Sequence, residues 1–155
     1  HDLAGTVLSE LAPSLERAVA AGIPRERIWI DPGIGFGKSA AESAAVLADL
    51  ARLTAGPYRA LCGASRKSCG GALAPNADGT LPGPLERLGG SLAALTVAVL
   101  RGAAAVRVHD VGVSRQAMLV ALALRTSSAE VRSPVDARSP VERARRAGLA
   151  GGPRG

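Results

Sequence analysis

Residues 31–38 read Asp-Pro-Gly-Ile-Gly-Phe-Gly-Lys and directly follow the apolar run Ile28-Trp29-Ile30. A short apolar run bounded by glycine and proline predicts a buried strand, which delivers the Asp31 carboxylate to its C-terminal end. The glycines leave the backbone bare, as is typical where a ligand must approach closely. We call residues 31–38 the glycine-rich turn. Its position after a strand and before a helix predicts a ligand site on a parallel α/β sheet.

The glycine-rich turn does not match the common phosphate motifs. A Walker A loop ending at Lys38 would need glycine where Pro32 stands, and a dinucleotide fingerprint would need glycine where Lys38 stands. The Asp31 carboxylate can accept two parallel hydrogen bonds from a planar amidine or guanidine edge. An aspartate that caps a helix or stabilises the loop is the alternative, and these residues alone leave both open.

Hydrophobic periodicity predicts an α/β chain in which helices and short strands alternate. The expected strands are residues 28–30, 60–64 and 104–108. The expected helices are residues 8–19, 39–53 with a Ser39–Glu42 capping box, 85–99, and from Ser114 to about Arg125. Residues 70–84 are predicted as a loop and residues 126–155 as a disordered tail. Such alternation favours right-handed βαβ units and a parallel sheet.

Polar side chains lie at the end of each of the three expected strands. Asp31 stands at the end of the first, Ser65-Arg66-Lys67-Ser68 at the end of the second and Arg107-Val108-His109-Asp110 at the end of the third. Parallel strands present their carboxyl ends at one rim, so these groups are expected to converge there. Arg107 and His109 alternate along an extended strand and are therefore predicted to share a face, where they could hold a diphosphate. A solvated Arg66, a structural His109 and a loop-capping Asp110 are the alternatives.

Charge and composition limit the partners. About half of the net charge of +6 lies in residues 126–155, and no basic stripe interleaved with aromatics occurs, so nucleic acid is not expected. Anionic small substrates remain compatible with the charge. Lys38 and Lys67 are the only lysines, which suggests that both positions need a compact ammonium. Cys62 and Cys69 form no disulfide pattern, and without a signal peptide or long apolar span we expect a cytoplasmic protein away from membranes.

Four motifs in series carry a family resemblance: D-P-G-I-G-F-G-K, S-R-K-S, E-R-L-G-G-S-L-A and R-V-H-D-V. Over roughly residues 1–125 the chain resembles dihydropteroate synthases, whose fold is a (β/α)8 TIM barrel. The resemblance implies that residues 1–125 are the C-terminal, roughly three-stranded part of a pterin-binding barrel, followed by the tail 126–155. The chain begins at His1 and is expected to be a piece of a longer protein.

The resemblance also implies roles for individual residues. Asp31 would hold the amino-pyrimidine edge of the pterin, and Lys67 would hydrogen-bond its ring. Arg107 would pack over the ring and, together with His109, hold the leaving diphosphate. The remaining residues would line the substrate pocket, with two near the p-aminobenzoate carboxylate and two near the pterin: Arg66, Ser68, Gly35 and Phe36. Lys67, Arg107 and His109 are the expected catalytic residues.

The implied reaction joins p-aminobenzoate to 6-hydroxymethyl-7,8-dihydropterin diphosphate and releases diphosphate. Mg2+ is the implied cofactor, bound by an asparagine of an N-terminal half that has no counterpart here, so this chain is expected to hold no metal site and to be inactive alone. The family is a sulfonamide target and is commonly a homodimer. Residues 69–71 (Cys-Gly-Gly) and a long 75–84 loop depart from the family pattern.

Two other functions fit part of these residues. A methyltransferase with the related pterin-binding barrel would share the Asp31 carboxylate but would need no diphosphate clamp, so Arg66-Lys67-Ser68 and Arg107-x-His109 argue against it. A non-catalytic remnant or assembly module is the third possibility.

Overall fold

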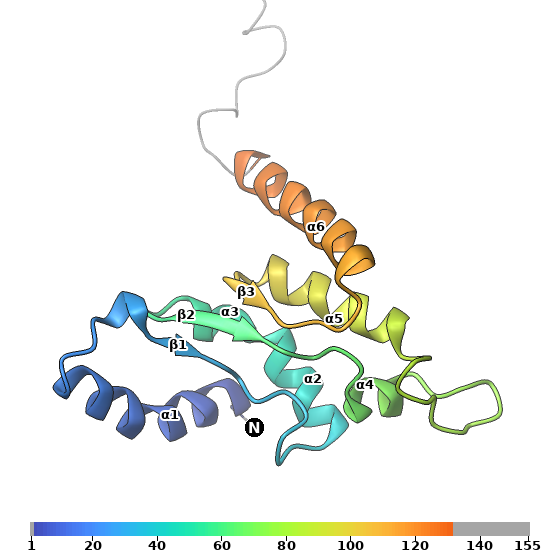
Figure 1. The fold of residues 1–155 in the computed structure, drawn as a ribbon, viewed down its shortest axis with the longest axis horizontal. Coiled ribbons are helices and arrows are strands. Elements are labelled where there is room, and N and C mark those ends of the chain that lie inside the picture. Colours follow the sequence, from blue (N-terminus) through green and yellow to red (C-terminus); the bar gives the residue numbers. More distant parts are fainter. Residues whose placement is uncertain (1, 132–155) are drawn as a thin grey trace, which may run out of the picture. The chain divides into compact units, whose positions relative to one another are not determined.

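The structure is a computed structural model, which describes residues 2–131. Helices and strands alternate along the chain (Figure 1). In chain order they are α1 (Leu3–Ala20), η1 (Arg25–Arg27), β1 (Trp29–Ile30), α2 (Ala40–Ala48), α3 (Leu50–Thr54), β2 (Arg59–Cys62), α4 (Ser68–Leu73), α5 (Leu88–Leu100), β3 (Ala105–Val106) and α6 (Val111–Val131). The elements up to Ala123 form one compact unit, which carries every candidate site residue.

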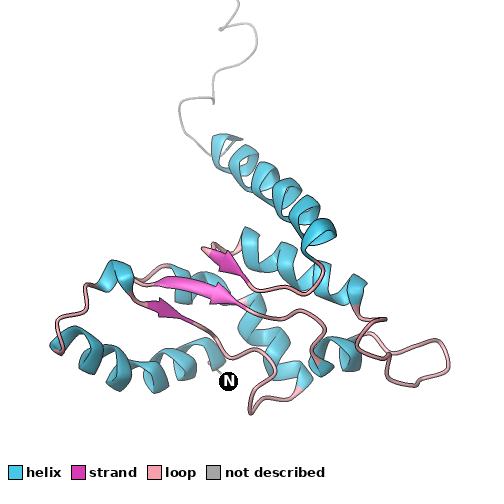
Figure 2. Cartoon of the chain, in the orientation of Figure 1, coloured by secondary structure: helices cyan, strands magenta, loops and turns pink. Residues whose placement is uncertain are grey.

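The three strands form a parallel sheet in the order β1-β2-β3 (Figure 2). Trp29 pairs with Arg59 and Ile30 with Ala60, and on the other side of β2 Leu61 pairs with Ala105. Each connection between neighbouring strands contains helices, as parallel crossovers require. The predicted parallel α/β architecture is therefore confirmed, and all three strands end at one edge of the sheet.

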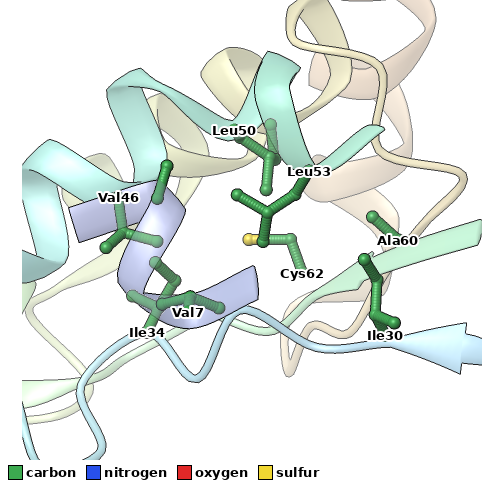
Figure 3. Packing of buried hydrophobic residues seen from close by; sticks show 10 residues of the cluster. Val7, Ile30, Ile34, Val46, Leu50, Leu53, Ala60 and Cys62 are labelled. Carbon is green, nitrogen blue, oxygen red and sulfur yellow. The ribbon is translucent and has the colours of Figure 1, made fainter. Parts of the chain in front are cut away.

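The core lies between one face of the sheet and the helices (Figure 3). Strand residues Ile30, Ala60 and Cys62 point into it and meet Leu50 and Leu53 of the α3 region, which are buried almost completely. Because strand side chains alternate, Trp29 points to the opposite face, where 45% of it is exposed and the Arg59 guanidinium lies 5.6 Å from its ring centre. Only one face of the sheet is thus packed by the described helices.

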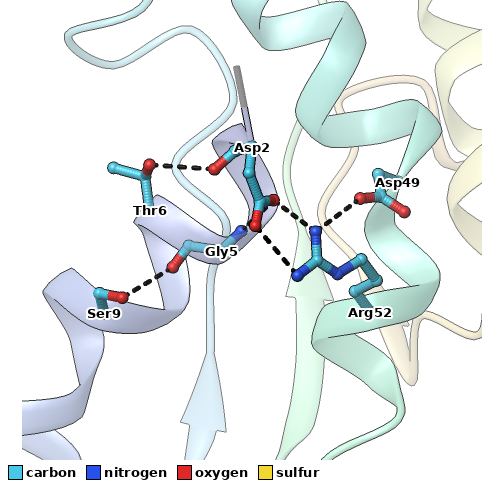
Figure 4. Close-up of polar contacts among 6 residues, drawn as sticks. All are labelled: Asp2, Gly5, Thr6, Ser9, Asp49 and Arg52. Carbon is cyan, nitrogen blue, oxygen red and sulfur yellow. Dashed lines mark hydrogen bonds and ion pairs between the residues drawn. The ribbon is translucent and has the colours of Figure 1, made fainter.

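Side-chain caps fix where the first helices begin. In α2, Glu42 donates its backbone N–H to Ser39 Oγ at 3.2 Å, and Ser39 donates its own to Glu42 Oε2 at 2.7 Å. The predicted capping box is therefore confirmed. In α1, Asp2 accepts the Gly5 N–H at 2.9 Å and also pairs with Arg52 of α3 (Figure 4). The Asp2–Arg52 pair links the first helix to α3.

Several predicted boundaries were wrong. Residues 70–73 of the stretch expected to be a loop belong to α4, and α5 starts at Leu88 rather than Leu85. The last helix does not begin at Ser114: α6 begins at Val111 and encloses Ser114, which is buried. Helix α6 also continues past Arg125 to Val131, into the stretch expected to be disordered. The rest of that tail, residues 132–155, lies outside the described residues.

None of the helices in residues 2–131 combines the length and the apolar character that crossing a membrane requires.

Candidate active site

The glycine-rich turn folds back on itself after β1. Asp31 Oδ1 accepts the Gly33 N–H at 2.9 Å, and the backbone is left-handed at Gly33, Gly35 and Gly37, with φ of 69°, 74° and 58°. Glycine takes this conformation without the steric cost that a Cβ brings. The Asp31 carboxylate therefore stabilises its own turn, and its side chain keeps 39% of its surface exposed for another partner.

Gly35 has no room for a side chain, because residues of the β2–α4 region pack closely against it. A Cβ at Gly35 would lie 3.1 Å from Lys67 Cδ and 3.3 Å from Cys69 Sγ. The group that comes close to this glycine is thus the Lys67 side chain from the β2–α4 connection. The Lys67 side chain therefore packs against the glycine-rich turn.

Lys67 lies across the turn. Its Nζ donates to the Ile34 carbonyl and stands 4.0 Å from the centre of the Phe36 ring, a cation–π contact. Burial lowers the pKa of Lys67, and the Asp31 carboxylate opposes that shift. Lys38 Nζ donates to the carbonyls of Gly33 and Phe36, each at 3.3 Å. Both lysines thus donate to carbonyls of one turn.

Arg107 and His109 follow β3, and their side chains lie near the same end of the sheet as Asp31 and Lys67. Arg107 Nη2 lies 3.8 Å from Asp31 Oδ2, and its guanidinium covers Gly63, where a Cβ would be 2.7 Å from Nη2. The His109 ring Nδ1 lies 3.1 Å from Ser65 Oγ, which also accepts the His109 backbone N–H at 3.2 Å. Strand β3 ends at Val106, so both residues belong to the connection after the strand rather than to an extended strand face.

Arg66 is held by a carboxylate. Its Nε donates to Asp110 Oδ2 at 3.0 Å, and Nη2 donates to the other oxygen, which gives a two-pronged ion pair. Hydrogen bonding from Arg66 lowers the pKa of Asp110. Asp110 was expected at most to cap a loop, so its pairing with Arg66 was missed. Its place directly after His109 was the available signal.

Ser68 differs from the other predicted site residues. It is the exposed first residue of α4, where Lys67 occupies the cap position without a side-chain cap bond. Ser68 therefore does not cap this helix. It stands beside the converging groups, not among them.

The converging groups line a cavity of about 340 Å3. Its walls are Gly63, Ser65, Arg66, Lys67, Pro84, Arg107 and His109. Three cations and a histidine in one cavity, beside one carboxylate, suit an anionic ligand with a hydrogen-bonding edge. We call it the cationic cavity. Ser65 belongs to the groups expected at this rim, whereas Gly63 and Pro84 were not predicted; Gly63 could have been found from its position directly after β2.

A second cavity of about 340 Å3 lies among α2, α4 and α5 and is lined mostly by small apolar side chains. The cationic cavity is the better candidate for chemistry because it gathers the groups that can bind and move charge.

The donor set of the cationic cavity does not suit a magnesium ion. Mg2+ prefers oxygen ligands, whereas this cavity presents mainly cationic nitrogens. Within residues 2–131 no group of three or more His, Cys, Asp and Glu side chains is placed to hold a metal.

Comparison with known proteins gives the family. Residues 1–109 match the model of the family described as "Pterin binding enzyme". The chain is 42% identical over 106 residues to the dihydropteroate synthase of Escherichia coli strain K12, which covers 68% of this chain and 36% of the relative.

Solved structures agree. A dihydropteroate synthase from Coxiella burnetii in complex with pteroic acid is 37% identical with a TM-score of 0.73, covering 80% of this chain and 44% of that one. A Xanthomonas albilineans dihydropteroate synthase with 4-aminobenzoic acid gives 38% and 0.73, covering 81% and 44%. The chain thus spans less than half the length of these relatives. By sequence and by fold, it belongs to the pterin-binding enzyme family.

Proposed function

We propose that this chain is the C-terminal part of a dihydropteroate synthase and supplies one wall of its active site. The observation that carries the proposal is the cationic cavity beside Asp31, with Arg107 Nη2 3.8 Å from the carboxylate. A pterin diphosphate has a planar amino-pyrimidine edge and an anionic leaving group. The cavity offers a carboxylate for the first and cations for the second.

In the proposed reaction, the bond between the pterin methylene and the diphosphate oxygen breaks, and diphosphate departs with the electron pair. The amine of p-aminobenzoate attacks the cationic carbon, forms the new carbon–nitrogen bond and loses a proton. Arg107 and His109 bind the departing charge, while Lys67 orients the ring. Cations fixed in place before the reaction stabilise such charge without having to reorganise.

The remaining residues have supporting roles in this proposal. Gly35 and Phe36 line the pterin side, and Arg66 and Ser68 lie on the p-aminobenzoate side. Because Arg66 is paired with Asp110, its charge is partly neutralised, and Ser68 is more available to a carboxylate. Magnesium would be bound by residues outside this chain. A cytoplasmic homodimer and sensitivity to sulfonamides complete the proposal.

The test is substitution of Asp31→Asn or Lys67→Ala in the full-length protein, that is, this chain with its upstream sequence. Each change should lower dihydropteroate formation by roughly 100-fold, because each removes a contact to the reacting pterin. Product is followed with labelled p-aminobenzoate and pterin affinity by calorimetry. Asp49→Asn, at an exposed carboxylate paired with Arg52, is the matched control. Unchanged turnover together with unchanged pterin affinity would refute these roles.

A second measurement concerns the chain alone. Three strands cannot close a barrel that needs eight strands and about 250 residues, so the isolated 155-residue chain should form no measurable dihydropteroate. Activity of the purified chain would contradict this expectation. If the full-length protein instead transferred a methyl group and ignored the diphosphate substrate, the related methyltransferase function would replace the proposal.

A further inference from the structure

The β2–α4 connection contains a backbone conformation that its own sequence does not favour. Arg66 has φ of 57° and is the one non-glycine residue with positive φ in the described part of the chain. A Cβ makes left-handed backbone unfavourable, so the surrounding structure must hold Arg66 there. Lys67, the next residue, takes its direction toward the Ile34 carbonyl from this conformation.

The first turn of α5 holds both backbone polar groups of Arg66. The Arg66 N–H donates to Ser91 Oγ at 2.8 Å, and the Arg66 carbonyl accepts from Arg87 Nη1 at 3.0 Å. The Ser91 hydroxyl in turn donates to the Arg87 carbonyl at 2.7 Å. A residue whose two flanking peptide groups are both bound by the N-terminal end of one helix has little freedom to return to the ordinary right-handed region.

Arg87 also fastens the long loop before α5. Its Nε donates to the Pro82 carbonyl at 2.9 Å, and Pro84 lines the cationic cavity. We call the two hydrogen bonds from Arg87 to Arg66 and Pro82 the Arg87 bridge. It connects the turn that carries Lys67 to the loop that closes one side of the cavity.

The Arg87 bridge fits over Gly71 in α4. A Cβ at Gly71 would lie 2.9 Å from Arg87 Nε and 3.4 Å from Pro82 Cγ, so any larger residue would displace the guanidinium. At the adjacent Gly70 a Cβ would meet nothing within 4 Å. Gly71 therefore provides the space in which Arg87 reaches both carbonyls.

We propose that Arg87, seated on Gly71, is a positioning residue that holds Arg66 left-handed and seats the Pro82–Pro84 segment at the cationic cavity. It acts through Arg66, Lys67 and the loop rather than on the reacting atoms. The proposal rests on the synthase function proposed above, because its consequence is the geometry of the p-aminobenzoate side. The long loop before α5 and the small residue at position 71 are parts of this one arrangement.

The test compares Arg87→Ala, Gly71→Ala, their double variant and the control Gly70→Ala in the full-length protein. The KM for p-aminobenzoate should rise about tenfold in Arg87→Ala and Gly71→Ala, the usual effect of losing a charged hydrogen bond. The KM for the pterin diphosphate should rise less, by about threefold, because Lys67 is displaced but Asp31 still holds the pterin from a different turn. Loss of folded protein alone would lower the active fraction and leave both KM values unchanged.

The double variant gives the sharpest outcome. Both substitutions break the same bridge, so the double variant should be no worse than Arg87→Ala alone. The proposal would be overturned if the increases in the KM for p-aminobenzoate multiplied in the double variant. It would also be overturned if Gly71→Ala behaved like Gly70→Ala. If Arg87→Ala does not fold, the comparison of Gly71→Ala with Gly70→Ala decides alone.

Failure of the function is distinguishable from failure of the bridge. If the wild-type protein forms no dihydropteroate, the proposed function fails, and amide hydrogen exchange then decides on the bridge. The Arg66 N–H should exchange about tenfold faster in Gly71→Ala than in Gly70→Ala, because Arg66 is then no longer held in its left-handed conformation by Arg87. Equal exchange would overturn the bridge.

Discussion

The turns after β1 and β2 reach left-handed backbone in two different ways. The first uses glycines at 33, 35 and 37, whereas the second uses Arg66. In both, the left-handed residue donates its N–H to a buried serine of a later helix: Gly35 to Ser43 at 3.1 Å, and Arg66 to Ser91 at 2.8 Å. The first turn encodes its shape in its own residues. The second depends on contacts from α5, so its shape is as stable as those contacts.

The largest effect is expected from adding a Cβ to the first turn. Gly35→Ala combines left-handed strain with a contact of 3.1 Å to Lys67, and should destabilise the protein by about 2–3 kcal/mol and displace the lysine. Gly37→Ala carries strain but meets nothing within 4 Å, so about 1 kcal/mol is expected. Urea unfolding of the full-length protein measures both. Equal losses would mean that Lys67 does not constrain Gly35.

Removing the paired serines compares the two turns directly. Ser91→Ala leaves the Arg66 N–H unsatisfied and should cost about 2 kcal/mol, because the left-handed arginine loses a support that it needs. Ser43→Ala leaves the Gly35 N–H unsatisfied, but glycine needs no help to keep its conformation, so about 1 kcal/mol is expected. Thermal or urea unfolding separates the two. A larger loss at Ser43 would reverse the comparison.

The smallest effect concerns acid pH and the Arg66–Asp110 pair. Arg66 lowers the pKa of Asp110 in the folded protein, so the pair stabilises the fold above the unfolded pKa of about 3.9. That stability is lost as the pH falls through the folded pKa. The stability difference between wild type and Asp110→Asn should therefore shrink below about pH 4.

Unfolding curves at pH 5, 4 and 3 would show this change. Arg66→Gln removes the cause of the pKa shift and should abolish the same pH dependence. A difference that stays constant with pH would mean that the pair contributes nothing to the linkage.

The same contrast explains what the sequence predicted. The strands, the Ser39–Glu42 capping box and the glycine-rich turn depend on neighbouring residues, and all were found. Helix α4 was missed because it is short and contains two glycines, so it has no amphipathic pattern. The Arg66–Asp110 pair and the support from Ser91 join residues far apart in the chain. No local pattern indicates that an arginine will be left-handed.

The exposed face of β1 carries a natural fluorescent probe. Trp29 is the single tryptophan of the chain, and 45% of it is exposed beside Arg59. Its fluorescence therefore reports on that face alone. Any segment that comes to cover the face should exclude water from the indole and shift its emission to shorter wavelength, without a label.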